Sequence, residues 1–267
     1  MKAFAVRYPF LFGILVSLAG TWGTLWPLCI HGLPQNVQIL LFRATGCLFA
    51  VLLLTALAWW REAGFVPIRS WRILIPYTPL ILVVLLIVVL MVVIPGSQVR
   101  DRALILFGAI SFLAGGFVEE ALFRGVVLRA FLPRGLMKAS LLSATVFSLA
   151  HLGNLLLGQD LIATMLQLVR AFLLGFAFVA LLAYTRNIWP LVILHAAINF
   201  SSFLGTGSIT LISTESPQLS DMLAEFAVFG LLAGFGFWLL RRAERNAKAK
   251  DAIMEQSVVL GGGAWKG

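Results

Sequence analysis

The sequence predicts an all-α polytopic membrane protein, a bundle of about eight transmembrane helices. Hydrophobic residues make up 61% of the 267 residues, and charged residues make up only 12%. A soluble domain has roughly 25% charged residues, and one of this size could not bury so much apolar surface. At roughly 20 residues for each span, the chain has room for seven to nine spans with short connections.

Apolar runs separated by basic or glycine- and proline-rich connections define the expected spans. They cover roughly residues 8–30, 38–60, 73–94, 103–130, 139–157, 161–184, 188–205 and 222–240. The first run follows Lys2 and Arg7 and has no convincing small-x-small cleavage site, so an uncleaved span is favoured over a signal peptide. We divide the chain into N-terminal helices over 1–100, a core over 101–205, and a last helix with a basic tail over 206–267.

The distribution of basic residues predicts an integral, multi-pass protein with both termini in the cytoplasm, in the cell membrane if the source is prokaryotic. Eight spans place both ends on one side, and most Lys and Arg residues of the connections fall on that side. The opposite connections contribute Arg100 and Arg102, which Asp101 partly offsets. The net charge of +9 is therefore explained by orientation in a lipid bilayer, and no nucleic-acid partner is expected because the charges are scattered.

Two adjacent carboxylates and an arginine lie inside the fourth expected span, in the sequence EEALFR at 119–124. Ionised side chains in a bilayer are costly, and they usually mark a transport pathway or a reaction. Glu120 and Arg124 are spaced i,i+4 on one helix face, where they can form a structural ion pair. Glu119 lies about 100° further round the helix and therefore needs a different partner.

Polar residues on two other expected spans are candidates for that partner. Phe147 and His151 are one turn apart on the fifth span, and His195 and Asn199 are one turn apart on the seventh. Any one of these polar side chains could simply hydrogen-bond two helices, at around 0.6 kcal/mol on average. Together they are costly in lipid unless they meet one another. We therefore infer one polar cavity shared by Glu119, His151, His195 and Asn199.

This set of residues is suited to hydrolysis. Glu119 beside a neutral His151 can hold a water molecule and remove its proton as the water attacks a carbonyl group. The amide of Asn199 and an N–H group of His195 can donate hydrogen bonds to the oxyanion that forms. In this interpretation Arg124, paired with Glu120, fixes the helix and does not react.

Three motifs in this order resemble the CPBP family. They are Glu-Glu-x-x-x-Arg at 119–124, Phe-x-x-x-His at 147–151 and His-x-x-x-Asn at 195–199, and the run WPLVILH at 189–195 is similar to a fourth motif. The family comprises type 2 CAAX prenyl proteases (Rce1-like), bacteriocin-processing proteins and related Abi intramembrane proteases, and the resemblance covers roughly 100–205. It implies an eight-helix endopeptidase with a cavity open to the cytosol, acting on a membrane-associated or lipidated peptide.

The resemblance also implies the residue roles. The first glutamate and the second-motif histidine, here Glu119 and His151, are expected to activate water. The last histidine and asparagine, here His195 and Asn199, are expected to bind the oxyanion. Glu120, Arg124 and Phe147 then support the site.

A zinc site is the alternative chemistry for the same residues. Two histidines and a carboxylate form a common catalytic zinc set, so Glu119, His151 and His195 could be ligands. The His-Glu-x-x-His motif is absent, and Glu120 is assigned to Arg124, whose positive charge opposes a nearby cation. A mechanism without a cofactor is therefore favoured, with zinc as the alternative.

Two other classes of function remain open. A proton-coupled carrier could use Glu119, Glu120, Arg170 and Glu225 as a relay, because buried carboxylates suit that role. A catalytically silent scaffold could use the same fold to bind a membrane partner. No internal repeat of the kind found in many carriers is evident in the sequence.

Overall fold

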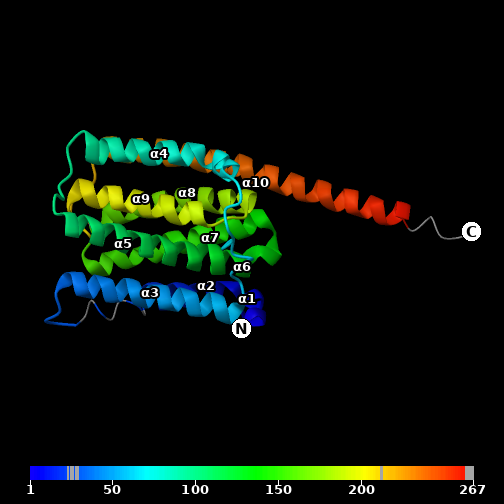
Figure 1. Ribbon diagram of the computed structural model, residues 1–267, viewed down its shortest axis with the longest axis horizontal. Helices are drawn as coiled ribbons and strands as arrows, with labels where there is room; N and C mark the ends of the chain where they lie inside the picture. The colour runs from blue at the N-terminus through cyan, green and yellow to red at the C-terminus, as the bar shows by residue number, and fades with distance from the viewer. Residues whose placement is uncertain (23, 25–26, 28–29, 211–212, 262–267) are drawn as a thin grey trace, which may run out of the picture.

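The computed structural model describes residues 1–22, 24, 27, 30–210 and 213–261, and all regular elements in this part of the chain are helical. The helices run roughly along one long axis (Figure 1). The N-terminal half consists of α1 (Lys2–Arg7), α2 (Pro9–Ser17), η1 (Leu18–Trp22), α3 (Gln35–Leu57), η3 (Trp71–Tyr77), α4 (Thr78–Val88) and η4 (Val89–Val93). The remainder consists of α5 (Arg102–Glu119), η5 (Glu120–Val127), α6 (Leu128–Phe131), η6 (Leu132–Arg134), α7 (Leu136–Ala150), η7 (His151–Leu157), α8 (Leu161–Thr185), α9 (Trp189–Thr206) and α10 (Leu219–Gly261).

Within the described residues, 7 helical stretches are long and apolar enough to cross a membrane. They are Gln35–Leu57, Trp71–Val93, Arg102–Arg134, Leu136–Leu157, Leu161–Thr185, Trp189–Thr206 and Met222–Asn246. The first expected span, 8–30, contains a shorter apolar helix at Pro9–Gly20, and part of that run lies outside the described residues. The predicted fold class, an all-α multi-pass membrane protein, is confirmed.

The first helix, α1, and the C-terminal part of α10 lie toward the same end of the bundle (Figure 1). The last helix, α10, continues past the ends of its neighbours at that end. Which side of the membrane this end faces stays a prediction, and so does the division of the chain into three parts.

The helix that carries the two glutamates is long and changes its hydrogen-bonding pattern partway. It begins at Asp101, whose carboxylate accepts hydrogen bonds from the backbone N–H groups of Ala103 and Leu104 and so caps α5. From Glu120 it continues as the π-helix η5, and short π segments inside α-helices often occur at functional sites. The hydroxyl of Ser143 on α7 donates to the carbonyl of Phe123 at 2.9 Å and ties η5 to its neighbour.

Glycines allow α5 to approach two other helices closely. A Cβ atom at Gly116 would lie 2.8 Å from the carbonyl oxygen of Val192, so α5 and α9 are nearly in backbone contact. The contact between α3 and α5 is also close, because a Cβ atom at Gly46 of α3 would lie 3.3 Å from the side chain of Val118 on α5. Small residues at such crossings let membrane helices pack closely, and here they fix the separation between α3, α5 and α9.

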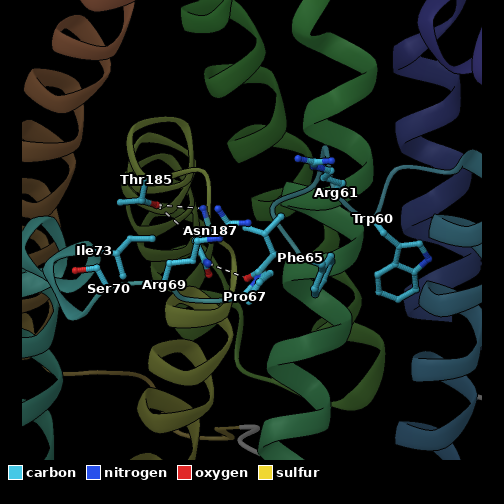
Figure 2. A pocket seen from close by; sticks show the side chains of 10 residues that line it. Trp60, Arg61, Phe65, Pro67, Arg69, Ser70, Ile73, Thr185 and Asn187 are labelled. Carbon is cyan, nitrogen blue, oxygen red and sulfur yellow. Dashed lines mark hydrogen bonds between the residues drawn. The ribbon is translucent and has the colours of Figure 1, made fainter.

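A cavity of about 720 Å³ lies between the connection after α3, the start of η3 and the end of α8 (Figure 2). Its wall is formed by Trp60, Arg61, Phe65, Val66, Pro67, Arg69, Ser70, Ile73, Thr185 and Asn187. The amide of Asn187 donates to the carbonyl of Val66 at 2.9 Å and holds this connection against the helices. None of the candidate catalytic residues lines this cavity.

Candidate active site

The two glutamates occupy the junction between α5 and η5, but their surroundings differ. The side chain of Glu119 is 29% exposed, whereas that of Glu120 is 0% exposed. Of these two carboxylates, Glu119 is therefore the one that a substrate or a water molecule can reach. Glu120 is enclosed by protein and must have its charge compensated there.

Arg124 provides the first compensating charge. Its Nη1 atom lies 3.1 Å from Oε1 of Glu120, and its side chain is only 1% exposed, so the ion pair expected from the i,i+4 spacing is present. The contact does not have the angles of a hydrogen bond, and Nη1 and Nη2 are buried without hydrogen-bond partners. The guanidinium instead stacks on two aromatic rings, with Cζ at 4.1 Å from the ring centre of Phe147 and 5.2 Å from that of Phe178.

His195 provides the second partner and joins the two carboxylates. Its Nδ1 atom lies 2.7 Å from Oε1 of Glu120, and its Nε2 atom lies 3.5 Å from Oε2 of Glu119. Because an ionised carboxylate only accepts hydrogen bonds, Nδ1 carries the hydrogen and donates it to Glu120. The contact between α5 and α9 at Gly116 is what brings His195 across to the glutamates.

His151 lies at the junction between α7 and η7, where the helix changes to 3₁₀ geometry. Its Nδ1 atom lies 3.0 Å from the carbonyl oxygen of Phe147, one turn earlier. Since a carbonyl oxygen accepts hydrogen bonds, Nδ1 is the donor, and in the neutral ring Nε2 is left as an acceptor. This is the tautomer that can accept a hydrogen bond from a water molecule.

The ring of Phe147 connects the two histidines. Its centre lies 5.0 Å from that of His151 and 6.2 Å from that of His195, and both imidazoles stand nearly perpendicular to it. Asn199 follows His195 by one turn of α9 and is half-buried. Among the described contacts its amide has no hydrogen-bond partner. The structure thus brings Glu119, Glu120 and His195 into direct contact and connects His151 to His195 through the ring of Phe147. Asn199 lies on the same face of α9 as His195 but contacts none of these side chains through a hydrogen bond.

Sequence reasoning missed two features of this site. It assigned Glu120 to Arg124 alone, whereas Glu120 also accepts a hydrogen bond from His195. Residue spacing within one helix does not predict how closely α5 and α9 approach each other, so this contact could not be foreseen. It also missed Phe178 and Gly175 of α8. A Cβ atom at Gly175 would lie 3.1 Å from the ring of Phe147 and 3.3 Å from Nη2 of Arg124. Both residues lie in an apolar run that gives no signal of a site.

A zinc ion does not fit these residues as they are arranged. Within the part of the chain that the structure describes, no group of three or more His, Cys, Asp or Glu side chains is placed to hold a metal ion. Glu119, His151 and His195 therefore do not form a zinc coordination set in this arrangement.

The fold and the site define a class: a helical, multi-pass membrane protein with a buried carboxylate–histidine–arginine cluster. Residues 101–201 match the family model described as type II CAAX prenyl endopeptidase, Rce1-like. Over these residues, 101 of the 267, the chain is similar to the Rce1-like CAAX prenyl endopeptidases, which are proteases. The match extends from the start of α5 into α9 and contains every candidate site residue. No curated protein and no solved structure is significantly similar to the chain.

Proposed function

We propose that the protein is an intramembrane endopeptidase that hydrolyses a peptide bond of a membrane-associated peptide or a prenylated CAAX-type substrate. One observation carries this proposal. The accessible carboxylate of Glu119 faces His195, and His195 is itself held by the fully buried Glu120. An accessible base beside a fixed imidazole, within the Rce1-like region, supports general-base hydrolysis.

In the proposed mechanism Glu119 is the general base. A water molecule donates hydrogen bonds to the carboxylate of Glu119 and to Nε2 of His151, which is free because Nδ1 bonds the carbonyl of Phe147. As the water oxygen bonds to the peptide carbonyl carbon, Glu119 takes one of its protons. The amide of Asn199 donates to the oxyanion, and His195, acting as an imidazolium with hydrogens on both nitrogens, donates to it from Nε2. When the C–N bond breaks, Glu119 returns the proton to the leaving amine.

The direct test is cleavage of prenylated CAAX-type and unmodified membrane peptides by purified protein in detergent. Glu119→Gln removes the base but keeps the shape, and should reduce turnover by about 10²- to 10⁴-fold. Glu215→Gln is the matched control, because Glu215 is exposed in the connection before α10 and should retain full activity. Turnover by Glu119→Gln equal to that of the control would contradict the assignment.

The physiological substrate can be identified by comparing membrane peptides from cells that express the wild type or Glu119→Ala. Substrates should accumulate uncleaved only in the variant, and their cut positions define the sequence around the scissile bond. Exhaustive chelation of the purified protein should leave cleavage unchanged. Stoichiometric zinc whose removal and return track the activity would contradict the metal-free mechanism.

We also propose that both termini, and the opening of the site, face the cytoplasm. The basic connections and the basic start of the tail support this orientation. Single cysteines introduced in the connection at 207–210 should react with an impermeant thiol reagent added outside intact cells. Cysteines placed near Arg69 should react only after lysis, and the reverse pattern would invert the orientation.

A further inference from the structure

Arg43 is an arginine inside a membrane-spanning helix that the mechanism does not use. It lies in α3, whose range Gln35–Leu57 is long and apolar enough to span the membrane, and it lies outside the matched region at 101–201. Among the described residues no carboxylate lies within ion-pair distance of it, and its Nε atom is buried without a hydrogen-bond partner. An intramembrane cation of this kind is costly and usually has a functional reason.

The guanidinium of Arg43 rests on the same helix that carries Glu119. A Cβ atom at Gly115 would lie 2.9 Å from its Nη1 atom and 3.0 Å from its Cζ atom, so the guanidinium packs directly against α5 and any larger residue at 115 would displace it. The register of the two helices is fixed nearby, where the thiol of Cys47 approaches the carbonyl of Ala114 at 3.9 Å. Gly115 precedes Glu119 by one helical turn, about 6 Å along the axis.

Glu119 does not neutralise Arg43 by direct pairing. The two groups interact electrostatically, but the ion-pair contact of Glu119 is with His195. The aromatic contact of the guanidinium is with the ring of its neighbour Phe42, whose centre lies 5.1 Å from Cζ. The half-buried Arg43 thus packs against α5 one turn before the proposed base. Among the described residues no Asp or Glu side chain pairs with the N–H groups of its guanidinium.

We propose that Arg43 binds the C-terminal carboxylate of the peptide substrate and so sets how far from the chain end cleavage occurs. The inference rests on the proposed function. A guanidinium can bind a carboxylate through two parallel hydrogen bonds, which fixes both position and orientation. A C-a-a-X sequence places the carboxylate three residues beyond its cysteine, up to about 10 Å away in an extended chain. That span is of the same order as one helical turn plus the contact distances at each end.

This arrangement selects for chain ends. A peptide without a free carboxylate would leave Arg43 in the membrane without a counter-ion, and a site built around a charged hydrogen bond strongly rejects a ligand that lacks the partner. An internal peptide bond of a long loop would therefore be a poor substrate. The same pairing offsets part of the cost of bringing the substrate carboxylate into the bilayer.

The test uses two peptides that differ only in a C-terminal carboxylate or carboxamide. For the wild type, kcat/KM should favour the carboxylate by on the order of 10- to 100-fold. Arg43→Gln should reduce this ratio to about one by slowing the carboxylate peptide, and Arg43→Lys should keep part of it because the charge remains. Arg102→Gln, an exposed arginine at the start of α5, should keep the wild-type ratio.

Two results would overturn the inference. One is a wild-type ratio near one, and the other is an Arg43→Gln variant that slows both peptides equally, which would show that Arg43 only positions Glu119. Equilibrium binding to the Glu119→Gln protein separates this inference from the proposed function. The carboxylate peptide should bind more tightly there, and adding Arg43→Gln should abolish the difference. Equal binding of both peptides would overturn the role of Arg43, whereas turnover by Glu119→Gln would overturn only the base assignment.

Discussion

Two carboxylate–arginine pairs of similar length connect residues of the bundle, and they differ in burial. Glu120 and Arg124 are 3.1 Å apart with side chains 0% and 1% exposed. Arg170 of α8 and Glu225 of α10 are 2.9 Å apart with side chains 38% and 29% exposed. The shorter pair is thus the more exposed one. Distance alone does not decide the importance of an ion pair, because removing one partner is costly only where the other charge stays buried.

The difference extends to what each pair organises. Glu120 also accepts a hydrogen bond from His195 and so links η5 to α9 at the site. Arg170 and Glu225 join α8 to α10 through one hydrogen bond. The carrier alternative required these two residues in a relay with the glutamates, and the structure pairs them with each other.

The largest stability effect is expected at Arg124. Arg124→Met leaves the buried Glu120 with only the hydrogen bond from His195, and should lower the free energy of unfolding by about 3–5 kcal/mol. Denaturant titration in a mild detergent measures it. Glu120→Gln/Arg124→Met, which removes both charges, should recover part of the loss. A single variant within 1 kcal/mol of the wild type would show that burial does not distinguish the two pairs.

A packing change at the α5–α9 contact should have the next largest effect. Gly116→Ala places a methyl group against the carbonyl of Val192, and should cost about 1–3 kcal/mol and reduce cleavage by moving Glu119 away from His195. Gly234→Ala in α10 is the matched control, because a Cβ atom there has nothing within 4 Å. The control should be neutral or stabilising by up to about 1 kcal/mol. Equal losses in both variants would refute the contact's role.

The half-exposed pair should contribute little. Glu225→Gln should lower the free energy of unfolding by about 0.2–1 kcal/mol, and the loss should shrink as salt screens the charges. Cleavage should be unchanged. A loss equal to that of Arg124→Met, or an abolished activity, would place Arg170 and Glu225 within the functional machinery.

The smallest effect concerns pH at the start of α8, in the connection outside the spans. The carboxylate of Asp160 accepts a hydrogen bond from the backbone N–H of Ala163, and this bond lowers the pKa of Asp160 below its ordinary value of 3.8. Its stabilisation is therefore complete above pH 3.8 and is lost as pH falls through the lower folded-state value. The Tm difference between wild type and Asp160→Asn should shrink on acidification below pH 3.8. A difference that does not change over this range would contradict the capping role.

The apolar runs and the spacing of polar residues predicted the helical membrane fold and the Glu120–Arg124 pair, while the assignment of the site residues stays a prediction. These features depend on composition and on periodicity within one helix, and both can be determined from a single sequence. The link from Glu120 to His195 depends on the close α5–α9 crossing at Gly116. The π-helix at Glu120 also has no sequence signal. The packing of Arg43 against α5 was not predicted either, because an arginine near the end of a span is ordinarily expected to extend toward the membrane surface.

The central claim is that the two adjacent glutamates have different tasks, and parallel measurements on Glu119→Gln and Glu120→Gln test it most directly. The account predicts that Glu119→Gln keeps the free energy of unfolding of the wild type and loses about 10²-fold or more of its turnover. It predicts that Glu120→Gln unfolds several kcal/mol more easily, because Arg124 and His195 lose their buried partner. A stable, inactive Glu120→Gln beside an active Glu119→Gln would contradict the account.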